Sequence, residues 1–179
     1  DQGRQILKAT DELTHIVKQS ASGWETELRI CIDSILLFDP IYRLIAEFQH
    51  AYPWINIRVS EEVFGGTWDA LNADRCDLII GGEAVPYGSE FNIDIIGEVD
   101  FLFAVAKDHP LAAHSLIAAA QPLSAEAIKQ YPSIVVADSS RQLPARSAGL
   151  LDGQSRITVP TMEKKITAHK LGLGVGYLP

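Results

Sequence analysis

Polar or small side chains follow five apolar runs of this chain, each at the point where a predicted strand ends. These positions are Asp33 and Ser34, Phe64 to Thr67, Gly81 to Glu83, Asp138 to Arg141, and Thr161 with Met162. In two-lobed α/β proteins, small molecules bind at the carboxyl ends of the strands, where helix N-termini offer unpaired backbone N–H groups and a partial positive charge. The chemistry expected of these residues is therefore recognition of a ligand.

Two of these residues carry hydroxyl groups, and three nearby side chains are apolar. Ser34 and Thr161 lie at strand-to-helix junctions, where a hydroxyl either contacts a ligand or only caps a helix or turn. Both interpretations stay open. For Phe64, Trp68 and Met162, packing in a hydrophobic core is the interpretation favoured for each residue taken singly.

The acidic residues near these strand ends limit the expected charge of a ligand. Asp33, Glu83 and Asp138 would repel a small carboxylate if their side chains faced it. A neutral or aromatic ligand with hydrogen-bonding groups is therefore favoured. The alternative is that these acids face water or pair with Lys107 or Arg146.

No arrangement in the sequence predicts catalysis, a cofactor or a metal. Gly172, Gly174 and Gly176 have the spacing of a phosphate-binding loop, but they follow a predicted helix and precede a strand, which reverses the order of dinucleotide-binding folds. The five histidines are scattered, and neither an HExxH nor a GxSxG motif occurs. Cys31 and Cys76 have no CxxC spacing and no histidine at metal spacing, so buried free thiols are expected.

The composition indicates a globular chain that does not itself bind a phosphate backbone. With 179 residues, of which 47% are apolar, it can form one ordinary domain or two small lobes. The formal net charge of −8 opposes DNA contact, because DNA affinity comes largely from lysine and arginine. No stretch has the apolar length of a membrane span, and the first residues do not form a signal peptide. A cytoplasmic protein without membrane contact is expected.

The first half of the chain predicts a helix followed by alternating strands and helices. Apolar residues spaced three and four apart over 4–20 predict a helix with a narrow seam, which either packs on its own domain or pairs with a second helix. Asp39 and Pro40 predict the N-cap and first residue of another helix, which ends before Pro53. Strands, with a short helix before the last of them, are expected at 28–32, 55–59 and 78–80. This order implies a parallel sheet.

The second half predicts a similar mixture of strands and helices. Residues 93–106 predict two strands, split near Gly97 and Glu98. The remaining expected elements are a helix at 124–131, strands at 134–136 and 157–159, a helix from Thr161 to Gly172, and a strand at 175–178.

Three segments carry a resemblance to a known family. Asp108-His109-Pro110-Leu111, the stretch from Leu171 to Pro179, and Ala73-Asp74-Arg75-Cys76-Asp77-Leu78 resemble the effector-binding domain of LysR-type transcriptional regulators. Ala73-Asp74 departs from the family pattern, which usually has a glycine there. The resemblance implies a two-lobed α/β fold of the type 2 periplasmic-binding-protein class, preceded by a linker helix. It places the end of the linker helix at 1–22, the first lobe at 23–98 and the second at 99–179.

The resemblance also implies a function and a set of site residues. It indicates an effector-sensing domain that binds a small organic molecule between the lobes and signals to an upstream winged helix-turn-helix, as a homodimer or homotetramer. The expected ligand-binding residues are Asp33, Ser34, Phe64, Gly66, Thr67, Gly82, Asp138, Thr161 and Met162, with Ser34 and Thr161 facing the cleft from opposite sides. The alternative is a solute-binding protein of a transporter, which shares the fold.

Two further expectations follow from the family pattern. Effector domains of this family pair through the first helix of the first lobe, so Ile41, Leu44, Ile45 and Phe48 are expected to divide between the core and a partner. The family completes the first lobe with segments after the position of Pro179. An exposed apolar surface, or one covered by a neighbouring chain, is therefore expected on the first lobe of this chain.

Overall fold

The first lobe contains a three-stranded parallel sheet in the order β2–β1–β3. β1 (Glu27–Asp33) pairs along its whole length with β2 (Asn56–Glu62), and its second half pairs with β3 (Leu78–Ile80). These strands lie where the sequence predicts them. The structure is a computed structural model that describes residues 26–82, 91–117 and 123–179. The helix predicted at 4–20 lies outside the described residues.

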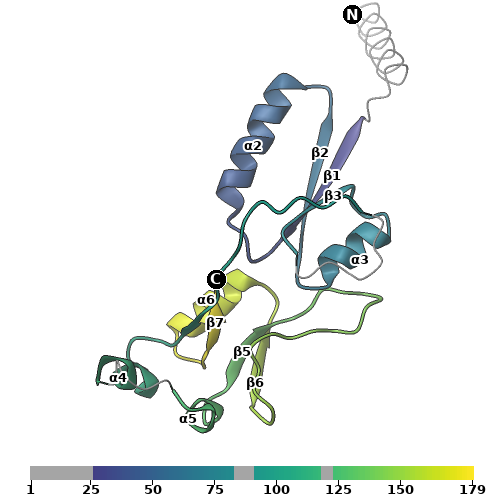
Figure 1. The fold of residues 1–179 in the computed structure, drawn as a ribbon. Helices are drawn as coiled ribbons and strands as arrows, with labels where there is room; N and C mark the ends of the chain where they lie inside the picture. The colour runs from purple at the N-terminus through teal and green to yellow at the C-terminus, as the bar shows by residue number, and fades with distance from the viewer. Residues whose placement is uncertain (1–25, 83–90, 118–122) are drawn as a thin grey trace, which may run out of the picture.

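Helices cover both faces of this sheet, as Figure 1 shows. Side chains of a strand alternate between faces, so Ile30 and Ile32 of β1 pack against Ile41 of α2 (Phe38–Ala51). Cys31 points to the other face, which α3 (Gly66–Asn72) covers. Burial on both faces explains why the last four residues of β1 are all buried.

α2 begins earlier than the sequence predicts. The helix starts at Phe38, and Leu37 occupies the N-cap position without a side-chain hydrogen bond. The predicted N-cap, Asp39, lies instead in the first turn, where its negative charge still favours the positive end of the helix dipole. Pro40 is tolerated there because first-turn N–H groups have no partner within the helix.

The second lobe is built from two strand pairs joined by a bridge. β5 (Ser133–Val136) is parallel to β6 (Arg156–Val159), and β4 (Leu102–Ala104) is antiparallel to β7 (Gly176–Leu178). A bridge between Ser133 and Val175 links the two pairs. The helices of this lobe are α4 (Pro110–Ile117), α5 (Ala125–Lys129) and α6 (Met162–Lys170), of which α6 packs on β5.

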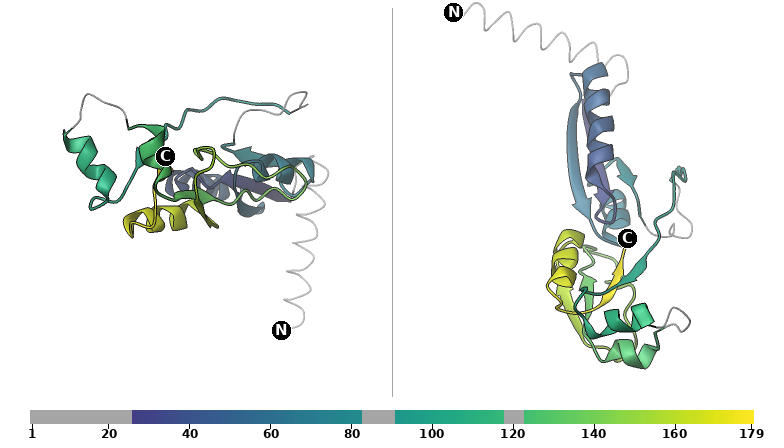
Figure 2. Two further views of the ribbon diagram at one scale, coloured as in Figure 1. Left: turned by 90° about the horizontal axis from the view of Figure 1, so that it is seen from below. Right: turned by 90° about the vertical axis from the view of Figure 1, so that its left-hand side faces the viewer.

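One predicted strand is absent from the described residues. Of the two strands expected within 93–106, only β4 forms, and residues 91–101 have no regular secondary structure. Figure 2 shows this segment along one side of the molecule, where it runs from the first lobe to the second. Apolar residues alone therefore do not make this segment a strand, because it lacks a neighbouring strand with which to pair.

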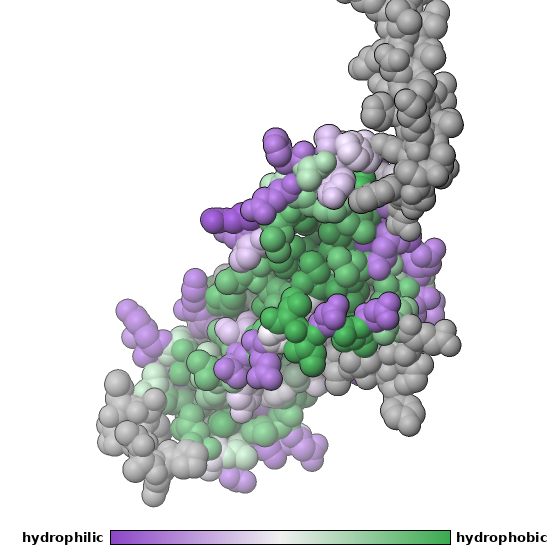
Figure 3. Space-filling model, turned by 45° about the horizontal axis from the view of Figure 1, so that its top comes forward, coloured by the Kyte–Doolittle hydropathy of each residue, from purple (hydrophilic) through white to green (hydrophobic). Residues whose placement is uncertain are grey.

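Apolar side chains of the first lobe and of the connecting segment are exposed. Ile95 and Ile96 are 90% and 81% exposed, and Leu78 is exposed in β3. Figure 3 shows apolar side chains gathered over a broad area of one face of the molecule. The exposed apolar surface predicted for this lobe is therefore present on the described residues. Within the same residues, no helix combines the length and apolar character that crossing a membrane requires.

Candidate functional site

A cavity of about 1060 Å³ lies between the two lobes. The first lobe contributes the residues that follow its strands, and the second contributes one face of α6 and parts of β5 and β7. Residues 96–101 and 148–151 complete the wall. The cavity thus lies at the carboxyl ends of the first-lobe strands, where the parallel sheet predicts a ligand site.

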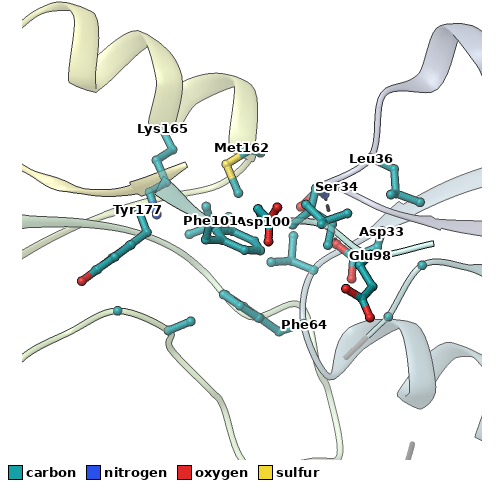
Figure 4. A pocket seen from close by; sticks show the side chains of 18 of the residues that line it. Asp33, Ser34, Leu36, Phe64, Glu98, Asp100, Phe101, Met162, Lys165 and Tyr177 are labelled. Atoms are coloured by element: carbon teal, nitrogen blue, oxygen red, sulfur yellow. Dashed lines mark hydrogen bonds between the residues drawn. The ribbon is translucent and has the colours of Figure 1, made fainter. Parts of the chain in front are cut away.

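Five of the nine predicted site residues line this cavity. They are Asp33, Ser34, Phe64, Gly82 and Met162. Figure 4 shows Ser34 and Asp33 on the first-lobe side and Met162 descending from α6. Phe64 has a φ of 50°, a left-handed conformation that is uncommon for a bulky residue. This backbone conformation belongs to the turn that brings the ring to the cavity.

The other four predicted residues do not line the cavity, and each has a structural role. Thr161 caps α6, because its hydroxyl oxygen accepts a hydrogen bond from the Lys164 N–H at 3.3 Å. Thr67 is fully buried and donates to the carbonyl oxygen of Phe64 at 3.0 Å. Ser34 and Thr161 therefore do not face one cleft from opposite sides, and Met162, next in the chain, is the one that reaches the cavity.

Asp138 and Gly66 contribute to packing between the lobes. The Asp138 carboxylate accepts hydrogen bonds from the backbone N–H groups of Ser140 and Arg146, each at 2.8 Å. Burial would raise the pKa of Asp138, but these hydrogen bonds and that of the Ser140 hydroxyl lower it. A Cβ atom added at Gly66 would overlap Oγ of Ser139, so the absence of a side chain there lets the lobes approach.

Ser34 has an unused hydrogen-bonding group at the cavity. The residue is 6% exposed, and among the described residues its hydroxyl has no hydrogen-bond partner. Its backbone N–H donates to the carbonyl oxygen of Glu62 at 3.0 Å, which fixes the turn after β1. Buried polar atoms are nearly always paired, so an orphaned hydroxyl in a cavity wall indicates a missing partner. A ligand in the cavity would supply that partner.

Lys165, which the sequence patterns did not predict as a site residue, also lines the cavity. Lys165 is 5% exposed, and burial lowers the pKa of its ammonium group. Its position three residues after Met162 puts both side chains on one face of α6. That spacing was the available signal, but adjacent lysines ordinarily indicate a solvated helix surface.

The charges around the cavity also differ from those that the strand ends suggest. Asp138 lies away from the cavity, Glu83 lies outside the described residues, and Asp33 accepts a hydrogen bond from the Ile35 N–H at 3.1 Å. Two acids that the strand ends do not contain, Glu98 and Asp100, line the cavity instead. Three acids, Asp33, Glu98 and Asp100, therefore line the cavity together with Lys165, and the expectation of a neutral ligand stays a prediction.

A buried ionic network holds the second lobe against α3. Asp69 accepts hydrogen bonds from the backbone N–H groups of Arg141 and Gln142 at 3.3 and 3.2 Å. The same carboxylate pairs with Arg75 at 2.8 Å, and Arg75 also pairs with Glu62 at 2.6 Å. Because Asp69 is buried, these contacts fix the position of the loop after β5 relative to the first lobe.

The described residues do not offer a metal site or a catalytic pair at the cavity. No group of three histidine, cysteine, aspartate or glutamate side chains in the described parts of the chain could hold a metal ion. His109 and His169 are buried in the second lobe, and neither lines the cavity. Binding is the chemistry that this arrangement supports.

Comparison with known proteins identifies related chains. Residues 21–179 match the family described as LysR substrate binding domain. The chain is 36% identical over 180 residues to the uncharacterized HTH-type transcriptional regulator YeeY of Escherichia coli (strain K12), covering 100% of this chain and 57% of that protein. It is 34% identical over 179 residues to the HTH-type transcriptional regulator PunR of the same strain, covering 99% and 56%. The chain thus spans a little over half the length of these relatives.

Solved structures share the fold. The effector binding domain of a BenM variant has a TM-score of 0.61 at 20% identity, covering 87% of this chain and 72% of that one. The effector binding domain of QuiR in complex with shikimate has a TM-score of 0.55 at 14% identity, covering 86% and 73%. At these identities the likeness concerns the fold, which is that of a two-lobed effector-binding domain.

Proposed function

The chain belongs to the LysR substrate-binding domain family, and from this premise we propose that it senses a small organic ligand for a transcriptional regulator. The ligand binds in the cavity between the lobes without being transformed. The observation that carries this proposal is a large interlobe cavity with the buried, unpartnered hydroxyl of Ser34 in its wall.

DNA binding belongs to another part of the regulator in this proposal. The net charge of −8 disfavours direct contact between this chain and DNA, and both relatives named above are HTH-type regulators longer than the chain. The predicted helix at 4–20 would link the two parts, and the cytoplasm, which contains the DNA, would be the site of action. The alternative of a transporter's solute-binding protein has no support from these relatives.

The lobes supply the means to transmit ligand binding. The proposed boundary near residue 98 falls in the irregular segment 91–101, which both connects the lobes and lines the cavity. A ligand that contacts both lobes would favour the lobe arrangement to which it binds more tightly. We also propose pairing of two copies through α2, because Tyr42 and Leu44 are exposed on its outer surface.

A thermal-shift screen tests the binding proposal. A ligand at 100 times its Kd stabilises the folded chain by about 2.7 kcal/mol, which raises the Tm of a protein of this size by roughly 5–10 °C. Replacing Ser34 with alanine should weaken binding of a hit about three- to tenfold, because one hydrogen bond is lost. Ser155→Ala, at an exposed position, is the matched control. Hits that bind Ser34→Ala unchanged and lie outside the cavity in a complex structure would overturn the proposal.

A further inference from the structure

Lys165 places a buried cation in the cavity without an anion to balance it. Among the described residues, none forms a hydrogen bond or ion pair with its ammonium group, so every described carboxylate oxygen lies more than 4.0 Å from Nζ. The next turn of α6 provides only His169, whose pKa is lowered first by burial and then by the charge of Lys165. A neutral His169 does not compensate the lysine.

Keeping such a charge has an energetic cost. An ammonium group removed from water loses much of its hydration, and the loss is usually offset by a paired carboxylate. The adjacent Lys164 shows the ordinary alternative, because it is 58% exposed and lies 3.5 Å from Glu163. A buried charge without a partner is unfavourable for folding, so its presence in the wall of a cavity is expected to have a functional reason.

The cavity has two ends of different chemical character, as Figure 4 shows. Lys165 lies at one end beside Tyr177, and Asp33 and Glu98 lie at the other, with Phe101, Asp100 and Met162 between them. One anionic group can therefore meet the lysine while Phe101 and Met162 contact the middle of a ligand, where Asp100 also disfavours a negative charge. The acidic end favours hydrogen-bond donors and disfavours a second negative charge.

We propose, on the basis of the ligand-binding function proposed above, that the ligand is a monocarboxylate whose carboxylate pairs with Lys165 and whose other end carries hydrogen-bond donors. The hydroxyl of Ser34 supplies a further contact near the acidic end. A phosphate monoester, with nearly two negative charges, fits less well because, among the described residues of the lining, Lys165 is the one cation while Asp33, Glu98 and Asp100 are acids.

Matched compounds test the charge requirement. The probes are 4-aminobenzoate with 4-aminobenzamide, 3-hydroxybenzoate with 3-hydroxybenzamide, 3-hydroxybutyrate with 3-hydroxybutyramide, and 4-aminophenyl phosphate as the dianion. Thermal shift and calorimetry on the chain should show that acids bind at least about tenfold more tightly than their amides, as expected for a hydrogen bond to a charged group. The phosphate should bind more weakly than 4-aminobenzoate.

Lys165→Met tests the residue, with Lys164→Met as the matched control. Methionine keeps the length of the side chain without its charge, so the variant should lose the preference for acids over amides. In the absence of ligand, its Tm should rise by about 2 °C or more, because an unpaired buried charge has been removed. Lys164→Met should change neither property. If Lys165→Met fails to fold, Lys165→Gln provides the same comparison.

The outcomes separate this inference from the proposal on which it rests. Amides that bind as tightly as acids, or a Lys165→Met variant that keeps the preference for acids, would overturn the monocarboxylate proposal and leave the ligand-binding function intact. A fall in the Tm of unliganded Lys165→Met would identify Lys165 as a structural residue and would also overturn it. Failure of these probes together with failure of a broad library of neutral compounds would count against ligand binding itself.

Discussion

Ser139 of the second lobe holds Val63 of the first lobe through three hydrogen bonds. Oγ of Ser139 accepts from the Val63 N–H at 2.8 Å and donates to the Val63 carbonyl oxygen at 3.2 Å. The Ser139 N–H donates to the same carbonyl oxygen at 3.3 Å. One residue thus satisfies both backbone polar groups of the position that follows β2, at the junction between the lobes.

Removing this hydroxyl should loosen the junction. Val63 is buried, and Ser139→Ala leaves its backbone N–H without a side-chain partner. An unsatisfied buried donor costs about 1–3 kcal/mol. Urea unfolding should show a loss in this range. Ser155→Ala, at an exposed serine, should unfold like the wild type. Equal stability of both variants would show that water replaces the hydroxyl without loss.

Gly66 should be intolerant of even one added carbon atom. Gly66→Ala puts a Cβ atom where Oγ of Ser139 lies, so the junction must open or the helix must shift. Such overpacking costs about 1–3 kcal/mol. Gly97→Ala is the control, because a Cβ there would have no atom within 4 Å. Chemical denaturation of the two variants gives the comparison, and similar stabilities would contradict the expected clash.

Acid should weaken the first lobe through Asp77. The Arg29 side chain donates to this carboxylate, which holds the pKa of Asp77 below its ordinary value. A lowered pKa in the folded state gives stability that is present above the ordinary pKa and is lost as the pH falls through the folded one. Unfolding free energies measured at pH 7 and pH 3 should therefore fall less for Asp77→Asn than for the wild type. An equal fall of the unfolding free energy in both proteins would exclude the pair of Arg29 and Asp77 as a contributor to the loss of stability in acid.

The two cysteines should be unreactive in the folded chain. Cys31 and Cys76 are buried together beside Ala70, and burial is the main reason why the pKa of Cys31 is raised to about 12. The reactive thiolate is therefore scarce at pH 8. Titration with a disulfide reagent should find no rapid reaction in buffer and two thiols in guanidinium chloride. Rapid labelling of a thiol in the folded state would contradict the packing of α3 on β1.

Much of the fold could be predicted from the sequence because its strands and helices follow from local patterns. The alternation of apolar residues around Ile30 predicted a strand, and Pro53 predicted the end of a helix. Both signals depend only on residues a few positions apart in the sequence. The start of α2 was placed too late because Asp39 suits the first turn as well as the N-cap. The second strand expected within 93–106 does not form, because a strand requires a partner strand that local sequence does not specify.

The site was predicted only in part, for a physical reason. Ser34 and Met162 were predicted correctly because each follows a strand, and the order of strands and helices alone brings the ends of the strands toward the cavity. Whether a hydroxyl such as that of Thr161 caps a helix or faces a cavity depends on its side-chain orientation, which spacing does not determine. Lys165 was missed because its burial depends on the packing of α6 within the folded chain, which the spacing of residues along the helix does not specify.

Ile96 and Val99 belong to two surfaces at once. Both line the interlobe cavity, and both have side chains that are exposed to solvent. Any protein contact that covers these side chains would alter the same segment that a ligand touches. Occupancy of the cavity and any such contact would then be thermodynamically linked, each altering the other by an equal free energy. Where a second copy of the chain makes that contact, the ligand affinity would vary with protein concentration, and a dilution series would separate the two equilibria.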